Sequence, residues 1–354
     1  MGSCLSRHRH TANLLPLVAG WTIETEVVHM NVAELEIDGQ RRDDGSTLFP
    51  LILSCETSEA RLDDVSEWIR SNSERLVNQA AEHGAVLFRG FPLRTDQDFD
   101  QFIRAFGLQN FTYEDSLSNA VRTNRTERVF TANEAPADVN ICLHHEMAQT
   151  PIYPSKLFFF CEKAAEQGGA TPLCRSDVLF ARMSQAMPQF TSDCREKGLL
   201  YSHTMPAEDD AASGMGRSWK STWKADRRDE AEQRMTDLGY SWEWLPDGCL
   251  KVTTPKLQAV RSLENGSTSF FNQLIAAFHG WKDSRNDPSK SITFGDGSPL
   301  DVETMNRVID MAEEITFDVP WQTGDVALVD NYVTMHGRRT FSGTRKVLAS
   351  LVAS

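Results

Sequence analysis

Residues 321–352 read WQTGDVALVDNYVTMHGRRTFSGTRKVLASLV, and no other stretch indicates the fold class as directly. Two short apolar runs, Val326–Val329 and Val347–Val352, each follow turn-forming residues, the first around Gly324 and the second around Gly343. Short apolar runs bounded by glycine-containing turns are typical of strands in closed or double-sheet β architectures. The stretch therefore predicts a mainly β core.

The same pattern continues upstream of this stretch. Further short strands are predicted at Leu48–Leu53, Ala85–Phe88, Ile141–Leu143 and Lys156–Cys161. Helices are predicted at 61–83, 96–106 and 177–187, the first because its apolar residues recur at helical spacing and Gly84 follows as a stop. The expected fold class is mainly β with peripheral helices (α+β).

Composition bounds the class of protein. The 354 residues carry 36 Lys plus Arg against 50 Asp plus Glu, a net charge of −14, which disfavours a nucleic-acid partner. The hydrophobic content of 40% and charged content of 24% are ordinary for a globular chain. Seven cysteines without a CxxC pair argue against a disulfide framework, so we expect a reduced, cytoplasmic setting.

The N-terminus offers two interpretations. Gly2 and Ser6 match the pattern for N-myristoylation, with Cys4 as a second acylation site, and membrane association is expected only if Gly2 and Cys4 are acylated. The alternative is a short polar start without a modification. We expect residues 1–45 to be an N-terminal extension, with membership of the fold as its alternative, and residues 46–354 to form a single domain, with a polar insert or lid near 204–236.

Metal-binding residue types crowd the segment Ile141–Glu146. On a strand, His144 and Glu146 project to the same face while His145 projects to the other. Two ligands on one strand leave a metal site incomplete, and His336, just after the strand Val326–Val329, is the best candidate for a third. Two His and one carboxylate with open positions are typical of non-haem Fe(II) oxygenases.

Two other classes remain open on these residues. A zinc-dependent hydrolase uses the same ligand types, although the HExxH spacing of helical zinc sites is absent. A non-catalytic jelly-roll binding protein is the second alternative. A cationic group follows His336, and it suits the anchoring of an organic acid beside the metal: Arg338, Arg339, Arg345 and Lys346.

The motifs, taken in order, resemble those of the Fe(II)/2-oxoglutarate-dependent dioxygenases of the taurine dioxygenase (TauD/TfdA) superfamily, in the branch of clavaminate-synthase-like and SyrP-like proteins. The matching segments run from 84 to 352: Val86–Phe91, His144–Met147 with Pro154 and Phe158–Cys161, Gly168–Leu173, Phe271–Gln273, Gly295–Gly297, Gly324–Val326, Asp330–Asn331 and His336–Lys346. Each segment alone is a weak signal, whereas the ordered set is specific.

The resemblance implies a double-stranded β-helix (jelly-roll) core. It implies that His144, Glu146 and His336 bind iron, and that Thr171 and Arg345 bind the distal carboxylate of 2-oxoglutarate, with Lys346 as the alternative anchor. The expected cofactor is Fe(II), with 2-oxoglutarate and O₂ as co-substrates and succinate and CO₂ as co-products.

The expected substrate is a small molecule, an amino acid or small carboxylate of secondary metabolism, oxidised at an unactivated C–H bond by hydroxylation, desaturation or cyclisation. Substrate contacts are predicted for Asn133, His145 and Arg338. For His145 the alternative is a position behind the metal ligands, where it would support them without contacting substrate. The sequence gives no indication of the oligomeric state.

Overall fold

The computed structural model describes residues 1–2, 30–42, 47–132 and 135–354. Cys4, Asn133 and most of the N-terminal extension lie outside the described residues. The interpretations that rest on Cys4 and Asn133 therefore stay predictions.

The larger sheet carries most of the strands predicted from the sequence. Its neighbouring strands are antiparallel apart from the parallel pair β2–β3. In spatial order the strands are β1 (Val32–Glu34), β2 (Leu51–Cys55), β3 (Ala85–Arg89), β16 (Val326–Asp330), β6 (Lys156–Lys163), β19 (Lys346–Val352) and β4 (Phe130–Thr131).

A smaller antiparallel sheet packs against one face of the larger one. Its order is β15 (Phe317–Val319), β8 (Thr171–Arg175), β17 (Thr334–Arg338) and β5 (Ile141–His144). One hydrophobic cluster joins the two sheets, with Ala327 and Val329 from the larger sheet and Leu173 from the smaller. The two packed sheets with helices outside them confirm the predicted fold class and jelly-roll core.

Strand β16 shows why its sequence is apolar without alternation. Ala327 and Val329 face the smaller sheet, whereas Val326 and Leu328 face the opposite layer of helices. Successive side chains of a strand point to opposite faces, so a strand covered on both sides is apolar throughout.

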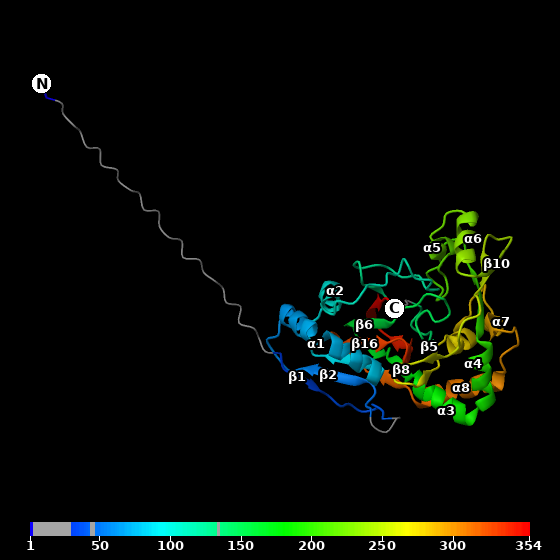
Figure 1. The fold of residues 1–354 in the computed structure, drawn as a ribbon, viewed down its shortest axis with the longest axis horizontal. Coiled ribbons are helices and arrows are strands. Elements are labelled where there is room, and N and C mark those ends of the chain that lie inside the picture. The colour runs from blue at the N-terminus through cyan, green and yellow to red at the C-terminus, as the bar shows by residue number, and fades with distance from the viewer. Residues whose placement is uncertain (3–29, 43–46, 133–134) are drawn as a thin grey trace.

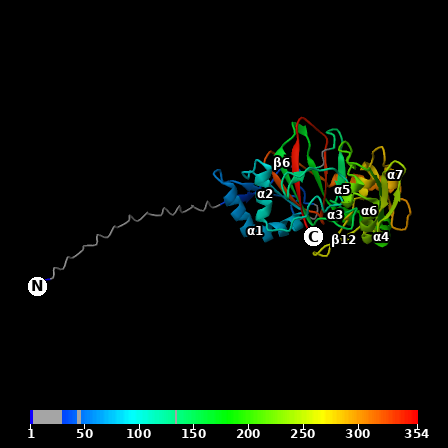
Figure 2. The same cartoon turned by 90° about the horizontal axis from the view of Figure 1, so that it is seen from above.

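Helices α1 (Leu62–His83) and α2 (Asp96–Ala105) cover the outer face of the larger sheet (Figure 1, Figure 2). Helix α1 ends at Gly84, as predicted, and Gly84 adopts a φ of +72°. A Cβ at this position would lie 2.5 Å from Thr334 Oγ1, so the turn also needs glycine for space. Thr334 Oγ1 donates to the Gly84 carbonyl (2.9 Å) and links this turn to β17.

A third layer lies on the far side of the smaller sheet, around its own hydrophobic cluster. Its helices are α3 (Ser176–Ala186), α4 (Pro188–Lys197), α7 (Pro288–Ser291), α8 (Val302–Glu314) and the π-helix η1 (Ala276–Gly280). The strands of its sheet lie in the order β10 (Ser241–Trp244), β11 (Leu250–Thr253), β9 (Leu199–Met205) and β14 (Ile292–Phe294). Two short pairs complete the strands of the described segments: β7 (Gln167–Gly168) with β18 (Phe341–Ser342), and β12 (Arg261–Ser262) with β13 (Thr268–Ser269).

The segment 204–236, expected to be a polar loop or lid, contains helix α5 (Trp219–Trp223) and most of helix α6 (Arg228–Asp237). These helices project from the body with β10 (Figure 1). Trp219 and Trp223 are buried in a separate hydrophobic cluster, so the tryptophans form ordinary packing within this projection.

His203 on β9 makes stability depend on pH. Burial lowers the pKa of His203 to about 4, with Asp283 opposing the shift, and neither ring nitrogen has a hydrogen-bond partner among the described residues. The unfolded chain, with a His pKa near 6.5, therefore binds the proton more readily, and stability is lost as the pH falls from about 6.5 to about 4.

We expect His203 to contribute about 2 kcal/mol to the loss of unfolding free energy between pH 7 and pH 5. Urea unfolding of the wild type and of His203→Leu at both pH values measures this contribution. The wild type should lose more stability than the variant, and equal losses would contradict the prediction.

Candidate active site

The two histidines of the predicted site are cross-strand neighbours. Strands β5 and β17 pair antiparallel, and the register places His144 opposite His336. Directly opposed residues hold their side chains close on one face of the sheet. The ring centroids of His144 and His336 lie 4.3 Å apart.

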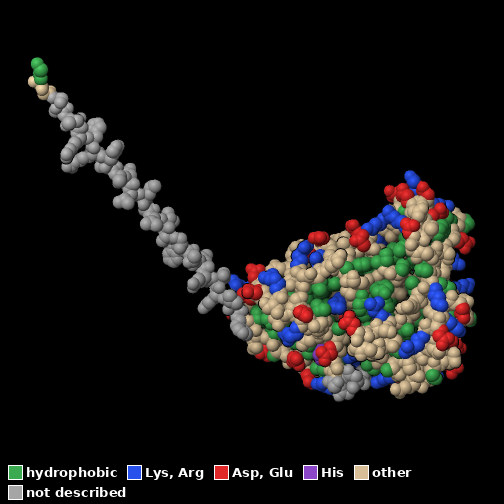
Figure 3. Space-filling model, in the orientation of Figure 1, with side chains coloured by type: hydrophobic (Ala, Val, Ile, Leu, Met, Phe, Trp, Pro, Cys, Tyr) green, Lys and Arg blue, Asp and Glu red, His purple; other side chains and the backbone are tan. Residues whose placement is uncertain are grey.

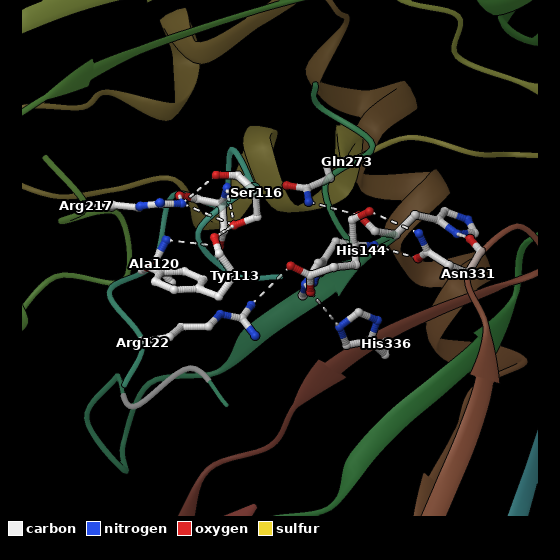
Figure 4. Close-up of polar contacts among 12 residues, drawn as sticks. Tyr113, Ser116, Ala120, Arg122, His144, Arg217, Gln273, Asn331 and His336 are labelled. Atoms are coloured by element: carbon white, nitrogen blue, oxygen red, sulfur yellow. Dashed lines mark hydrogen bonds and ion pairs between the residues drawn. The ribbon is translucent and has the colours of Figure 1, made fainter. Parts of the chain in front are cut away.

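Glu146 follows the end of β5 and is fixed through its backbone. The Glu146 N–H donates to Asn331 Oδ1 (2.8 Å), and Asn331 Nδ2 donates to the Glu146 carbonyl (3.0 Å). Asn331 thereby connects the segment after β5 to the turn between β16 and β17 (Figure 4). The carboxylate Oε2 of Glu146 lies 3.5 Å from His336 Nε2 and 3.9 Å from His144 Nε2.

The three side chains fit a divalent metal. Each offers one ligand atom, and these atoms all lie within 4.8 Å of one another. His144 Nδ1 lies 2.8 Å from the Cys142 carbonyl, which only accepts, so Nδ1 carries the hydrogen and the Nε2 lone pair faces Glu146. Two imidazoles and a carboxylate are the donor set that suits non-haem iron.

Protonation states agree with metal binding. Burial, assisted by the nearby His336, lowers the pKa of His144 to about 4, so this imidazole is neutral at pH 7. Burial alone would raise the pKa of Glu146, but the charge of Arg122 and the contact with His336 outweigh it and hold this pKa well below its usual range. Metal ligands must be deprotonated, and both groups meet that requirement.

His145 occupies the opposite side of the chain, as the strand period predicted. It is fully buried, its Nδ1 contacts the Asn331 carbonyl, and its ring packs 4.8 Å from that of Phe271. Burial lowers the pKa of His145 to about 3. His145 lines neither cavity beside the cluster, so the expectation of a substrate contact must be corrected, because alternation along the chain turns its side chain away.

Two cavities meet at the cluster and share a wall of Arg122, Ile141, His144 and Glu146. The larger, of about 400 Å³, extends towards residues 210–215 and 280–283. The smaller is lined by His336, Thr171 and Arg345 among others. The face drawn in Figure 3 is hollowed beside the projecting helices, with apolar and basic side chains in the hollow.

The smaller cavity contains the predicted pair Thr171 and Arg345. Arg345 Nε donates to the Gly169 carbonyl (2.8 Å), and its Nη2 lies 3.4 Å from Thr171 Oγ1. Trp321 Nε1 also donates to Thr171 Oγ1 (2.9 Å). Lys346 instead is exposed, with its Nζ 3.9 Å from Glu162 Oε2. The structure therefore places Arg345, and not Lys346, beside the cluster.

Arg338, which the sequence predicted to contact substrate, lines the smaller cavity and also stabilises a neighbouring loop. Its guanidinium donates to the carbonyls of Ala135 (2.7 Å), Pro136 (2.6 Å) and Val139 (2.8 Å). All three of these residues line the larger cavity or its edge. These bonds fix the loop that forms one wall, and a substrate contact of Arg338 stays a prediction.

Sequence reasoning missed Arg122 altogether. Arg122 Nη2 donates to Glu146 Oε1 (3.1 Å), and both side chains are buried. Arg122 lies in a polar segment with Arg125 and Arg128 nearby, so its residue type and position gave no signal. Asn331 was matched only as part of a motif, and Trp321 carried no signal of its contact with Thr171.

Comparison with known proteins places the chain in a family. Residues 48–351 match the family model described as "Taurine catabolism dioxygenase TauD, TfdA family". The chain belongs to this family. A clavaminate synthase-like protein of Arabidopsis thaliana is 41% identical over 318 residues, which cover 88% of this chain and 96% of that protein.

More distant matches agree with the fold. The dapdiamide synthesis protein DdaC of Enterobacter agglomerans is 26% identical over 317 residues, covering 85% of this chain and 90% of that protein. Among solved structures, PvcB from Pseudomonas aeruginosa covers 94% of each chain at 12% identity with a TM-score of 0.51, which shows a shared fold.

The predicted family and enzyme class are confirmed. The chain is an Fe(II)- and 2-oxoglutarate-dependent dioxygenase, which decides against a zinc hydrolase and against a non-catalytic binding protein. No helix in the described part of the chain is both long and apolar enough to cross a membrane.

Proposed function

We propose that His144, Glu146 and His336 hold Fe(II), and that Thr171 and Arg345 bind the distal carboxylate of 2-oxoglutarate in the smaller cavity. The observation that supports this assignment is the meeting of two cavities at one three-donor cluster. When bound, the iron and its co-substrates supply oxidation of an unactivated C–H bond, with succinate and CO₂ as co-products.

The side chains around the smaller cavity orient and anchor the co-substrate. Arg345 is held by the Gly169 carbonyl and offers its remaining donors to a carboxylate, which a planar guanidinium binds in a fork. Burial, together with Arg338, lowers the pKa of Arg345 to about 10, so Arg345 stays charged at pH 7. The two cavities separate a co-substrate side from a substrate side of the cluster.

We propose that the larger cavity takes a small molecule, an amino acid or small carboxylate of secondary metabolism. Its wall combines the buried Gln149 and Gln273 with apolar groups such as Met215 and Trp281, which suits a small ligand with polar ends. A relative acting in dapdiamide synthesis supports this substrate class. Hydroxylation, desaturation and cyclisation are all compatible with the site.

We further propose that residues 46–354 act as one domain, which strand β1 (Val32–Glu34) of the extension joins by pairing with β2, and that the segment 204–236 covers the substrate side. The family match over 48–351 supports the single domain. Asp210, Ser213 and Met215 line the larger cavity, which supports a role of this segment in excluding water from the site.

A screen of amino acids and small carboxylates for stimulated succinate formation tests the function. We expect at least one compound to raise succinate formation by about tenfold or more over 2-oxoglutarate alone, since substrate completes the site. Zinc should inhibit, and an oxidised form of the compound should appear by mass spectrometry. Succinate formation that no compound changes, or turnover supported by zinc, would contradict the proposal.

A further inference from the structure

The two carboxylate oxygens of Glu146 have different surroundings. Oε2 faces both histidines, 3.5 Å from His336 Nε2 and 3.9 Å from His144 Nε2. Oε1 accepts from Arg122 Nη2 at 3.1 Å. The side chains of Arg122 and Glu146 are 8% and 6% exposed, so water competes little with this ion pair.

Arg122 is itself held in place from two directions. Its guanidinium lies over the Phe130 ring, 5.4 Å from the centroid. The segment before it is braced by the buried Arg217, whose Nη1 donates to the Ser116 carbonyl (2.7 Å) (Figure 4). Tyr113 Oη donates to the Ala120 carbonyl (2.8 Å), which closes the loop leading to Arg122.

We propose that Arg122 is a positioning residue that holds Glu146 in a one-oxygen binding mode. A carboxylate is able to bind a metal through one oxygen or through both. With Oε1 held by Arg122, only Oε2 is directed at the histidines. One-oxygen binding leaves an additional position of the metal open to 2-oxoglutarate or O₂, which this site needs. This inference rests on the proposed function, because it concerns the metal held by this cluster.

The structure excludes a role of Arg122 as a simple surface charge. A surface ion pair contributes little and tolerates substitution. Arg125, three residues later, is such a case: its Nε lies 2.9 Å from Asp96 Oδ2 and its side chain is 38% exposed. Arg125→Gln is therefore the matched control for Arg122→Gln.

The test compares wild type, Arg122→Gln, Arg122→Lys and Arg125→Gln with two readouts. Absorption of the Co(II)-loaded protein, without co-substrate, reports the number of metal ligands. Anaerobic titration of the Fe(II)-loaded protein with 2-oxoglutarate gives its Kd. For Arg122→Gln we expect an altered Co(II) spectrum and a Kd raised by about 10- to 100-fold, the range for residues that orient a ligand. Arg125→Gln should match the wild type in both readouts.

The two readouts separate positioning from charge. A raised Kd with an unchanged Co(II) spectrum would mean that Arg122 acts only as a charge, and this result would overturn the proposal, as would wild-type behaviour of Arg122→Gln. If Arg122→Gln fails to fold, Arg122→Lys decides, because it keeps the charge but replaces the guanidinium that holds Oε1: an altered Co(II) spectrum together with a raised Kd supports the proposal, and wild-type values in both readouts overturn it. If the wild type shows no 2-oxoglutarate binding, the proposed function fails with it.

Discussion

Replacement of His336 by Ala is expected to remove stable metal binding and to lower substrate-stimulated succinate formation by about 1000-fold or more. His336 supplies one of the three donor atoms, and its strand partner His144 and the nearby Glu146 have no further metal-binding side chain beside them in the described part of the chain. A metal contributes several kcal/mol to its reaction, and about 4 kcal/mol corresponds to roughly 1000-fold in rate.

The control for this variant is His279→Ala. His279 is exposed on the π-helix η1, outside both the metal cluster and the smaller cavity. Native mass spectrometry measures the bound metal, and a coupled assay measures succinate. Full metal occupancy in His336→Ala would mean that the ligand assignment is wrong. Loss of metal from His279→Ala would show that the effect is not specific to the cluster.

Replacement of Arg345 by Ala is expected to raise the Kd for 2-oxoglutarate by about 100-fold. Hydrogen bonds to a charged group contribute up to about 3 kcal/mol, which corresponds to this factor. Arg345 lines the smaller cavity beside Thr171, whereas its neighbour Lys346 is 57% exposed and faces Glu162. Substitutions of these two adjacent cations are therefore expected to have different effects on the Kd for 2-oxoglutarate.

Lys346→Ala should leave the Kd within about twofold of the wild-type value, because surface ion pairs contribute little. Anaerobic titration with 2-oxoglutarate measures all three proteins under the same conditions. Arg345→Lys should recover part of the affinity, since it restores the charge but not the fork. Equal Kd values for Arg345→Ala and Lys346→Ala would mean that the anchor has been placed on the wrong residue.

Periodicity and glycine positions predicted the parts of the fold that carry the site. Helix α1 spans Leu62–His83 against a predicted 61–83, and Gly84 ends it with a positive φ. Strands β3 and β16 follow their apolar runs because both faces of each are covered. These elements depend on local chemistry, which a single sequence contains.

For the segment 204–236, the amino-acid composition alone did not predict the secondary structure. Its many charged residues predicted a loop, yet helix α6 places its charges on solvent and buries Ala231 and Met235. The projecting cluster also draws on Tyr240 and Leu250, which lie outside the segment. A core assembled from several separate segments leaves no periodic signal in any one of them.

The candidate site also combines features that the sequence predicted with features that it did not. The strand period alone predicted that His144 and Glu146 project together and His145 away, and the structure has them so. The pairing of His144 with His336 depends on the register between two strands far apart in the sequence. The bond from Arg122 to Glu146 depends on how the loop that carries Arg122 packs against the cluster, so residue types alone did not indicate Arg122.

An anaerobic titration of the Fe(II)-loaded protein with 2-oxoglutarate, followed by visible absorption, tests the assignment of the iron ligands and of the co-substrate cavity together. If His144, Glu146 and His336 hold the iron and the smaller cavity holds the co-substrate, a weak charge-transfer band appears in the middle of the visible spectrum. This band saturates at one equivalent of 2-oxoglutarate and is absent from His144→Ala. A protein that binds Fe(II) and 2-oxoglutarate without this band, or a band that survives in His144→Ala, would contradict the proposed iron site.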